Sequence, residues 1–331
     1  MTVSDPRTAT DLDFPRDGPR GSQLRFMLNH AVLAPSVLNT QPWRFAVEGD
    51  EVRLYADRAR QLHAVDPLGR NLALSCGAAL LNLRLAAHHH GYRAPYELLP
   101  DPAAPDLLAC LSLGPPGPAS GDDEDLFGAI VRRHTERRPL APTLIEADVL
   151  TSLQGEAERE GARLHVVQGA AEKAALAGLV ADAIRAEGDD PEVRDELRGW
   201  LRADRDPRPD GVPDAEQDLE GRRYGARVPA SAHAEATRRL AAEAPVLLVV
   251  TSRWDDPRGW LMAGQALERV LLRATLLGLS ASFLNPAVEV DAVRERLAAL
   301  VGGGCPQVVL RMGYPVPRGG TARRRVDDVS A

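Results

Sequence analysis

The 331-residue sequence has few cysteines, a single lysine and no long apolar run. Its three cysteines are far apart and form no CxxC pair, which excludes a disulfide framework and a zinc ribbon and favours a reducing compartment. No apolar run reaches about 18 residues, so no membrane span is expected. The net charge of −7 argues against a nucleic-acid-binding surface. Because Lys173 is the only lysine, any anion site must be built from arginine.

The first 21 residues contain four aspartates and no apolar stretch. Such a segment is no secretory signal, and its composition predicts a disordered N-terminal arm over residues 1–21. With neither a signal nor a membrane span, we expect a cytoplasmic protein.

Three short patches recur in the same order in the two halves of the chain. Residues 33–36 (LAPS) return at 140–143 (LAPT), 77–80 (GAAL) at 264–267 (GQAL), and 111–115 (LSLGP) as LRMGYP at 310–315. We therefore predict two copies of one unit that mixes helices and strands. The first copy spans 22–118 and the second spans 119–318, followed by an arginine-rich tail at 319–331.

Each copy is expected to begin with a helix, at 23–33 and at 124–138. Each also has a long segment that is apolar on nearly every face, at 75–91 and 260–278, which is typical of a fully buried helix. Strands are predicted from apolar and β-branched runs. They are expected at 45–48, 52–56, 107–113, 163–167, 246–251 and 307–312.

The second copy contains an insertion at 186–231 that is rich in charge, proline and glycine. Long insertions of this kind in compact domains are often lids or binding loops. Trp200, beside Leu197 and Leu201, is the expected apolar anchor of this lid.

Several common ligand motifs are absent or misplaced. The sequence has no GxGxxG, and the glycines at 302–304 precede a strand instead of a helix, so neither a Rossmann site nor a phosphate loop is expected. His88, His89 and His90 form a histidine tract. Because consecutive helical residues point in different directions, no metal site is expected there.

Two arginine clusters stand out. Four arginines lie within residues 132–138, and their planar donors suit a phosphate group, although a solvated helix end has the same composition. The second cluster, at 323–325, would by itself be an ordinary charged tail. Their related places in the repeat favour one shared phosphate site.

Small polar side chains lie between two prolines at 35–42. Since Pro35 and Pro42 restrict the backbone, Ser36, Asn39 and Gln41 can be held at fixed angles. This arrangement suits recognition of a ring with several donors and acceptors, although a capped helix end followed by a turn has similar residues.

These segments resemble motifs of a known family. PSVLNTQPWRF at 35–45, RHTER at 133–137 and GLSASFLNP at 278–286 are similar to segments of the nitroreductase superfamily of FMN flavoproteins. Together with DPLGRNLALSCGAAL at 66–80, LRMGYP and the terminal RRR, the set resembles the Acg-type branch over about residues 23–328. The resemblance implies an α+β nitroreductase-like fold with antiparallel sheets and long buried helices.

In that superfamily two chains usually form a dimer with the flavin at their interface. The Acg-type branch fuses two such units in one chain, so the resemblance implies a pseudo-dimer, one FMN per chain and a monomer in solution. Carried over by position, Arg133, Thr135 and Arg137 should hold the phosphate, and Arg323 or Arg325 should close on it.

The resemblance also implies that Pro35, Ser36 and Asn39 contact the flavin from across the pseudo-interface. Leu284 and Asn285 should lie beside the reactive nitrogen of the central ring, where a backbone N–H would stabilise negative charge. Glu136 departs from the branch, which usually has asparagine, and no flavin contact is expected of it.

The implied function is an FMN oxidoreductase that passes electrons from NAD(P)H or an organic donor to a small acceptor. The flavin carries the chemistry, so no side chain is expected to act as an acid–base catalyst. Two alternatives stay open. One is a flavin-sequestering or storage protein with a lid-covered FMN. The other is a tailoring dehydrogenase that acts on a peptide or natural product.

Overall fold

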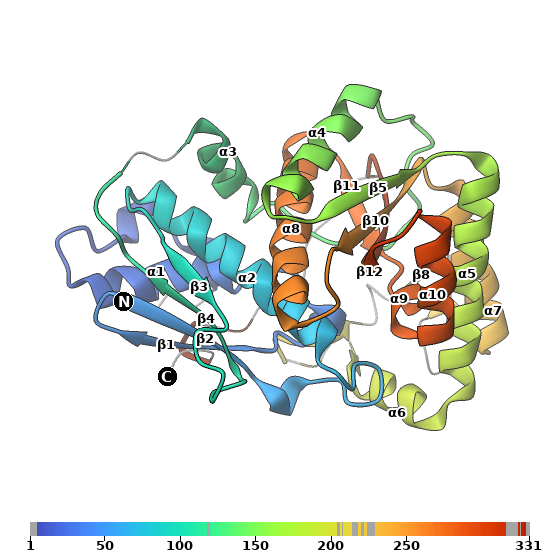
Figure 1. Ribbon diagram of the computed structural model, residues 1–331, viewed down its shortest axis with the longest axis horizontal. Coiled ribbons are helices and arrows are strands. Elements are labelled where there is room, and N and C mark those ends of the chain that lie inside the picture. The colour runs from blue at the N-terminus through green and yellow to red at the C-terminus, as the bar shows by residue number, and fades with distance from the viewer. Residues whose placement is uncertain are drawn as a thin grey trace.

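The computed structural model describes residues 5–117, 120–203, 206, 208–213, 218–219, 222–223, 229–315, 324 and 326–328. Within these residues, two four-stranded antiparallel sheets lie on opposite sides of a pair of long crossing helices, α2 and α8 (Figure 1). None of the described helices is both long enough and apolar enough to cross a membrane.

The first sheet has the order β1-β2-β4-β3. Its strands are β1 (Trp43–Glu48), β2 (Glu51–Ala56), β3 (Tyr96–Leu98) and β4 (Leu107–Ser112). Burial alternates along β1, because one face of the sheet packs on helices and the other meets solvent. The helices of this half are α1 (Arg20–Ala31) and α2 (Arg70–His89).

The second sheet has the order β11-β12-β10-β5. Its strands are β5 (Arg163–Val167), β10 (Val246–Ser252), β11 (Ser280–Phe283) and β12 (Cys305–Gly313). Every residue of β10 is buried, because helices cover both faces of this sheet. Leu248 and Val250 belong to the same apolar cluster as α8, whereas Leu247 and Val249 belong to the cluster that includes α5 and α7.

The remaining described elements are eight helices, two short strand pairs and five short 3-10 helices. The helices are α3 (Gly121–Ala129), α4 (Ala147–Arg159), α5 (Ala170–Asp189), α6 (Pro191–Gly199), α7 (Ala230–Glu243), α8 (Pro257–Leu276), α9 (Pro286–Glu289) and α10 (Asp291–Leu300). Short strand pairs are β6 (Leu201–Arg202) with β7 (Val212–Pro213), and β8 (Asp218–Leu219) with β9 (Arg222–Arg223). Short 3-10 helices are η1 (Pro6–Thr8), η2 (Asp11–Asp13), η3 (Val37–Asn39), η4 (Arg58–Arg60) and η6 (Val326–Asp328).

The two sheets have the same strand order when each is read across from the strand that comes first in the sequence. β1-β2-β4-β3 corresponds to β5-β10-β12-β11, and each sheet takes two strands before its long helix and two after it. The helices α2 and α8 therefore occupy equivalent positions. These are the two segments whose sequences recur at 77–80 and 264–267.

Glycines allow α2 and α8 to approach at backbone distance. A Cβ at Gly77 would lie 2.2 Å from the carbonyl oxygen of Leu261, and a Cβ at Gly264 would lie 2.0 Å from that of Leu74. The two contacts are related by one constant shift in sequence, so the crossing is symmetric. Any larger residue would push the helices apart.

The N-terminal segment differs from its prediction. Residues 5–21 are structured, with η1, η2 and the start of α1, so the predicted disorder is wrong from Asp5 onward. Phe14 provides the reason, because its ring is buried and stacks on His90 with centroids 3.7 Å apart. Residues 1–4 lie outside the described part.

Candidate functional site

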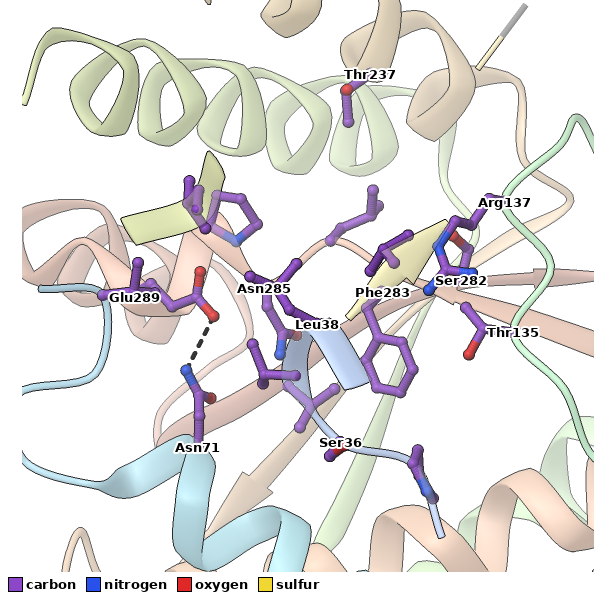
Figure 2. A pocket seen from close by; sticks show the side chains of 18 of the residues that line it. Ser36, Leu38, Asn71, Thr135, Arg137, Thr237, Ser282, Phe283, Asn285 and Glu289 are labelled. Atoms are coloured by element: carbon purple, nitrogen blue, oxygen red, sulfur yellow. Dashed lines mark hydrogen bonds between the residues drawn. The ribbon is translucent and has the colours of Figure 1, made fainter. Parts of the chain in front are cut away.

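A cavity of about 180 Å³ lies between the two halves, and the insertion forms part of its wall (Figure 2). Six residues expected at the flavin line this cavity. They are Pro35, Ser36, Thr135, Arg137, Leu284 and Asn285. Asn39, Arg133 and Trp200 are not among the lining residues, and Arg323 and Arg325 lie outside the described residues.

The arginine segment forms an extended loop. The helix expected at 124–138 ends at Ala129, because the following backbone pairs with β11 instead of with itself. Thr135 bridges to Ala281, and the Glu136 N–H donates to the Ala281 carbonyl at 2.9 Å. This pairing directs Thr135 and Arg137 toward the cavity.

Arg311 hydrogen-bonds to the backbone of this loop and also lines the cavity. Its side chain is only 2% exposed, and its Nη2 donates to the carbonyls of Arg137 and Arg138 at 2.7 and 2.9 Å. Burial lowers the pKa of Arg311 to about 10. Our sequence reasoning missed this residue, although a single charge within the apolar run 307–312 was a signal.

Arg133 lies behind the wall of the cavity. It is 8% exposed, its Nε is 3.6 Å from Oε1 of Glu268, and its Nη2 donates to the Leu33 carbonyl at 3.2 Å. The expected phosphate contact is therefore not available to Arg133 in this arrangement. Glu136 is likewise buried and binds Arg138, with Oε2 2.7 Å from Nη2, in line with the expectation that it does not reach the flavin.

The loop at 36–42 has an unusual backbone. Leu38, Asn39 and Gln41 have positive φ angles of 47°, 56° and 50°, which side-chain-bearing residues seldom adopt. Each such residue costs about 1–3 kcal/mol, and such residues cluster at functional sites. The Ser36 hydroxyl stabilises the loop by accepting a hydrogen bond from the Gln41 N–H at 2.9 Å.

Asn39 contacts the insertion, whereas we expected it to contact the flavin. Its Nδ2 donates to the carbonyls of Pro209 and Gly211 at 3.2 and 3.3 Å. Gln41 also donates to Pro209, at 3.0 Å, and its Oε1 accepts from the backbone N–H of Arg324 at 2.7 Å. The loop therefore fastens both the insertion and the C-terminal tail.

The insertion contributes apolar side chains to the cavity, namely Leu197, Leu201 and Val212. Trp200 caps the end of α6, and its carbonyl accepts from the Val212 N–H at 2.9 Å. Its neighbours Leu197 and Leu201 line the cavity, whereas Trp200 does not, and the anchoring role expected of its ring stays a prediction. Glu196 adds a second attachment, because its Oε2 accepts from the N–H groups of Ala64 and Val65 at 3.0 and 2.9 Å.

Leu284 and Asn285 directly follow β11, and Figure 2 shows Asn285 at the cavity. The backbone N–H of Leu284 donates to Val309 at 2.8 Å, so it is not available to a ligand as we expected. Asn285 accepts from the Val309 N–H through Oδ1 at 3.3 Å, and the residue lines the cavity.

A pair of carboxyl groups forms the far end of the cavity, and our sequence reasoning missed both. Glu289 accepts from Nδ2 of Asn71 at 2.9 Å, and Glu187 hydrogen-bonds to Glu289. Burial raises the pKa of Glu289, and burial together with the Glu289 charge raises the pKa of Glu187 well above its usual range. The ionised form of each carboxyl group is therefore disfavoured at this end of the cavity.

Comparison with known proteins identifies the family, although no family model matches the chain. Rv3131 of Mycobacterium tuberculosis, named a putative NAD(P)H nitroreductase, is 32% identical over 94% of this chain and 92% of its own length. Acg of the same organism, similarly named, is 30% identical over 90% of this chain and 92% of its own. The chain belongs to the Acg branch of the nitroreductase family. The resemblance inferred from its motifs is thus confirmed.

Solved structures are similar to this nitroreductase in part of the chain. An FMN-bound nitroreductase from Bacteroides fragilis covers 60% of this chain and 94% of its own, with 18% identity and a TM-score of 0.39. An iodotyrosine deiodinase bound to FMN and 3-iodo-L-tyrosine covers 60% and 95%, with 16% identity and a TM-score of 0.41. The α+β class is confirmed by the structure itself, whose antiparallel sheets pack with long buried helices.

Proposed function

We propose that this nitroreductase is an FMN-dependent oxidoreductase whose single flavin occupies the cavity between its two halves. Electrons pass from NAD(P)H or an organic donor to a small-molecule acceptor. The observation that carries the proposal is the cavity wall itself. It joins Ser36 of the first half to Thr135, Arg137 and Asn285 of the second, and these are the motifs that resemble the family's flavin site.

The chemistry of the wall fits FMN. Arg137 and the Thr135 hydroxyl offer donors for a phosphate at one end, while Leu38 and Leu284 offer apolar surface for a ring. When bound, FMN supplies hydride and single-electron chemistry. Asn285 lines the cavity beside this apolar surface, and the Glu187–Glu289 pair, whose pKa values are raised, lies at the far end of the same cavity.

We further propose that the chain is a monomer, because its two halves form an internal pseudo-dimer with one flavin site. The shared strand order of the two sheets and the symmetric crossing at Gly77 and Gly264 support this arrangement. Light scattering of the purified protein is expected to give the mass of one chain. A tight dimer would contradict the proposal.

A flavin-sequestering role is the second candidate, and the insertion favours it. Leu197 and Leu201 cover the cavity, and Asn39, Gln41 and Glu196 fasten the insertion over it. Anaerobic stopped-flow reduction of the bound flavin by NADPH and NADH separates the two roles. Fast reduction supports the enzyme, whereas slow reduction that accelerates when the insertion is loosened supports storage.

The cofactor itself is tested by extraction and affinity measurement. We expect FMN at one per chain, and Arg137→Ala should weaken FMN binding by about 1.5–3 kcal/mol, the range for a charge-assisted hydrogen bond. Arg132→Ala is the matched control, because Arg132 is exposed and bonds only within its own segment, to the Gly128 carbonyl at 3.2 Å. Equal FMN affinity in both variants would contradict the phosphate assignment.

A further inference from the structure

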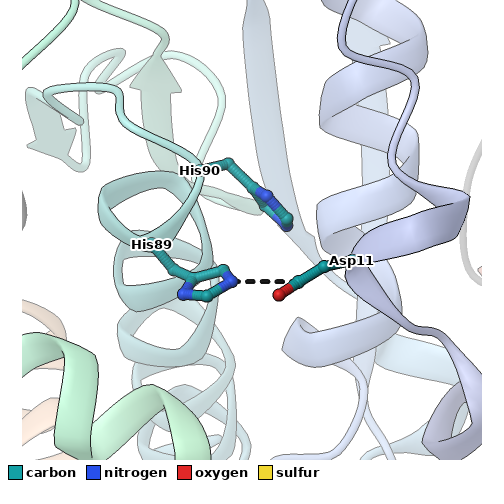
Figure 3. Close-up of side chains that lie close together, drawn as sticks. All are labelled: Asp11, His89 and His90. Carbon is teal, nitrogen blue, oxygen red and sulfur yellow. Dashed lines mark hydrogen bonds and ion pairs between the residues drawn. The ribbon is translucent and has the colours of Figure 1, made fainter.

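Three potential metal ligands meet at the end of α2 opposite the cavity (Figure 3). Nε2 of His89 lies 2.9 Å from Oδ1 of Asp11, and one ligand atom from each of Asp11, His89 and His90 lies within 4.8 Å of the others. At 1.5 Å per residue, His89 is roughly 27 Å along the helix from Asn71 in the cavity wall. The cluster is therefore separate from the flavin site.

The sequence argued against convergence of these histidines, and the structure removes that objection. The helix α2 ends at His89, so His90 lies at its cap and no longer follows helical geometry. Asp11 comes from η2, in the segment expected to be disordered. The turn after the helix and the folded N-terminal segment together bring the three side chains to one point.

His90 provides the observation that points to a ligand. It is only 8% exposed, and neither ring nitrogen has a hydrogen-bond partner among the described residues. Burial lowers the pKa of His90 to about 3, so the ring is neutral and keeps a free lone pair. A buried polar atom without a partner is unfavourable, and a bound cation would supply the missing partner.

His89 is oriented as histidine ligands usually are. Its Nδ1 lies 2.8 Å from Oε1 of Glu124, in α3, while its Nε2 faces Asp11. A carboxylate that accepts the Nδ1 proton fixes the tautomer whose Nε2 lone pair is available to a metal. Without a metal, a proton on Nε2 of His89 could form a hydrogen bond to Asp11 with the same geometry. That arrangement gives the His90 ring nitrogens no partner among the described residues.

We propose that Asp11, His89 and His90 bind a divalent transition-metal ion of the zinc class. Imidazole nitrogens and a carboxylate are suitable ligands for Zn²⁺, and water would complete a tetrahedron. Ligand atoms at such an ion are about 3.3 Å apart, so the widest separation must shrink by roughly 1.5 Å. The exposed Asp11 side chain and the helix end carrying His90 can make this shift.

The bound ion ties the N-terminal segment to α2, so binding also stabilises the fold. The test uses the untagged full-length protein after treatment with a chelator. Titration with Co²⁺ at about pH 7.5 is expected to show one binding event with the visible absorption of a four-coordinate ion. Zn²⁺ should displace the Co²⁺ and raise the midpoint of thermal unfolding.

His90→Ala should lower the Co²⁺ affinity by roughly 100-fold. Asp11→Asn preserves the shape of the segment and should lower the affinity while circular dichroism shows an intact fold. His88→Ala is the matched control within the same tract, because Nδ1 of His88 bonds Asp123 at 2.9 Å and is not part of the cluster. Absence of one-to-one binding, or equal losses in the His88 and His90 variants, would overturn the proposal.

Discussion

Arg133 and Glu268 form a buried ion pair in which Nε lies 3.6 Å from Oε1. The pair lies behind the loop that carries Thr135 and Arg137, at the junction between the two halves. A family motif residue thus supports the cavity wall from inside and is not exposed within the cavity.

Replacement of Arg133 should therefore affect stability more than ligand binding. Removing one partner of a buried pair leaves the other charge uncompensated, which costs about 3–5 kcal/mol. We expect Arg133→Ala to lower the free energy of unfolding by that amount in urea titrations of the flavin-free protein. If the variant instead has unchanged stability and binds FMN much more weakly, Arg133 contacts the phosphate directly, as its motif suggested.

The crossing of α2 and α8 should tolerate no side chain at its two glycines. Gly77→Ala and Gly264→Ala would each place a Cβ about 2 Å from a backbone oxygen, and overpacking of this kind costs about 1–3 kcal/mol or more. Gly178→Ala in α5 is the control, since no atom lies within 4 Å of the added Cβ. There the midpoint of thermal unfolding should rise slightly, as alanine favours helix. Equal effects at all three positions would refute the tight crossing.

Loosening the insertion should open the cavity. Asn39→Ala removes two hydrogen bonds to the backbone of the insertion, so amide exchange at Gly211 and Val212 should accelerate and bound flavin should be reduced faster. Trp200→Ala should have a smaller effect, because the Trp200 ring is not part of the cavity wall. If Trp200→Ala has the larger effect, Trp200 anchors the insertion, as its sequence composition suggested.

The carboxyl pair should make stability depend on pH. Because burial raises the folded-state pKa of Glu187 above its ordinary value of 4.5, the group contributes stability below that value and loses it as pH rises. Glu187→Gln should therefore gain stability relative to the parent protein as pH increases from about 5 to 8. Unfolding free energies of both proteins across this range provide the measurement, and a constant difference would contradict the raised pKa of Glu187.

The sequence was most informative where a local pattern determines the outcome. The recurrence of GAAL and GQAL predicted equivalent buried helices, and α2 and α8 are these helices. The strands at 45–48, 52–56, 163–167, 246–251 and 307–312 also lie within observed strands, because alternation and apolar runs are local signals. The motif residues Ser36, Thr135 and Asn285 reach one cavity, which their spacing alone does not indicate.

The sequence was least informative where a partner distant in the chain decides the outcome. Arg133 turns inward because Glu268 lies there, and Asn39 turns toward Pro209 in the insertion. The helix α3 ends at Ala129, before the predicted end at residue 138, because the following backbone hydrogen-bonds to β11. None of these partners could be chosen without knowing how the two halves meet.

The symmetric crossing has a consequence for the continuity of the chain. The chain passes from the first unit to the second between the end of β4 at Ser112 and the start of α3 at Gly121. The contact between α2 and α8 is formed by groups of these two helices and does not include that link. Because this contact does not include the link, we expect the two units to associate even when the link is cut. Two fragments separated in this link are expected to reassemble and to form the cavity from two polypeptides.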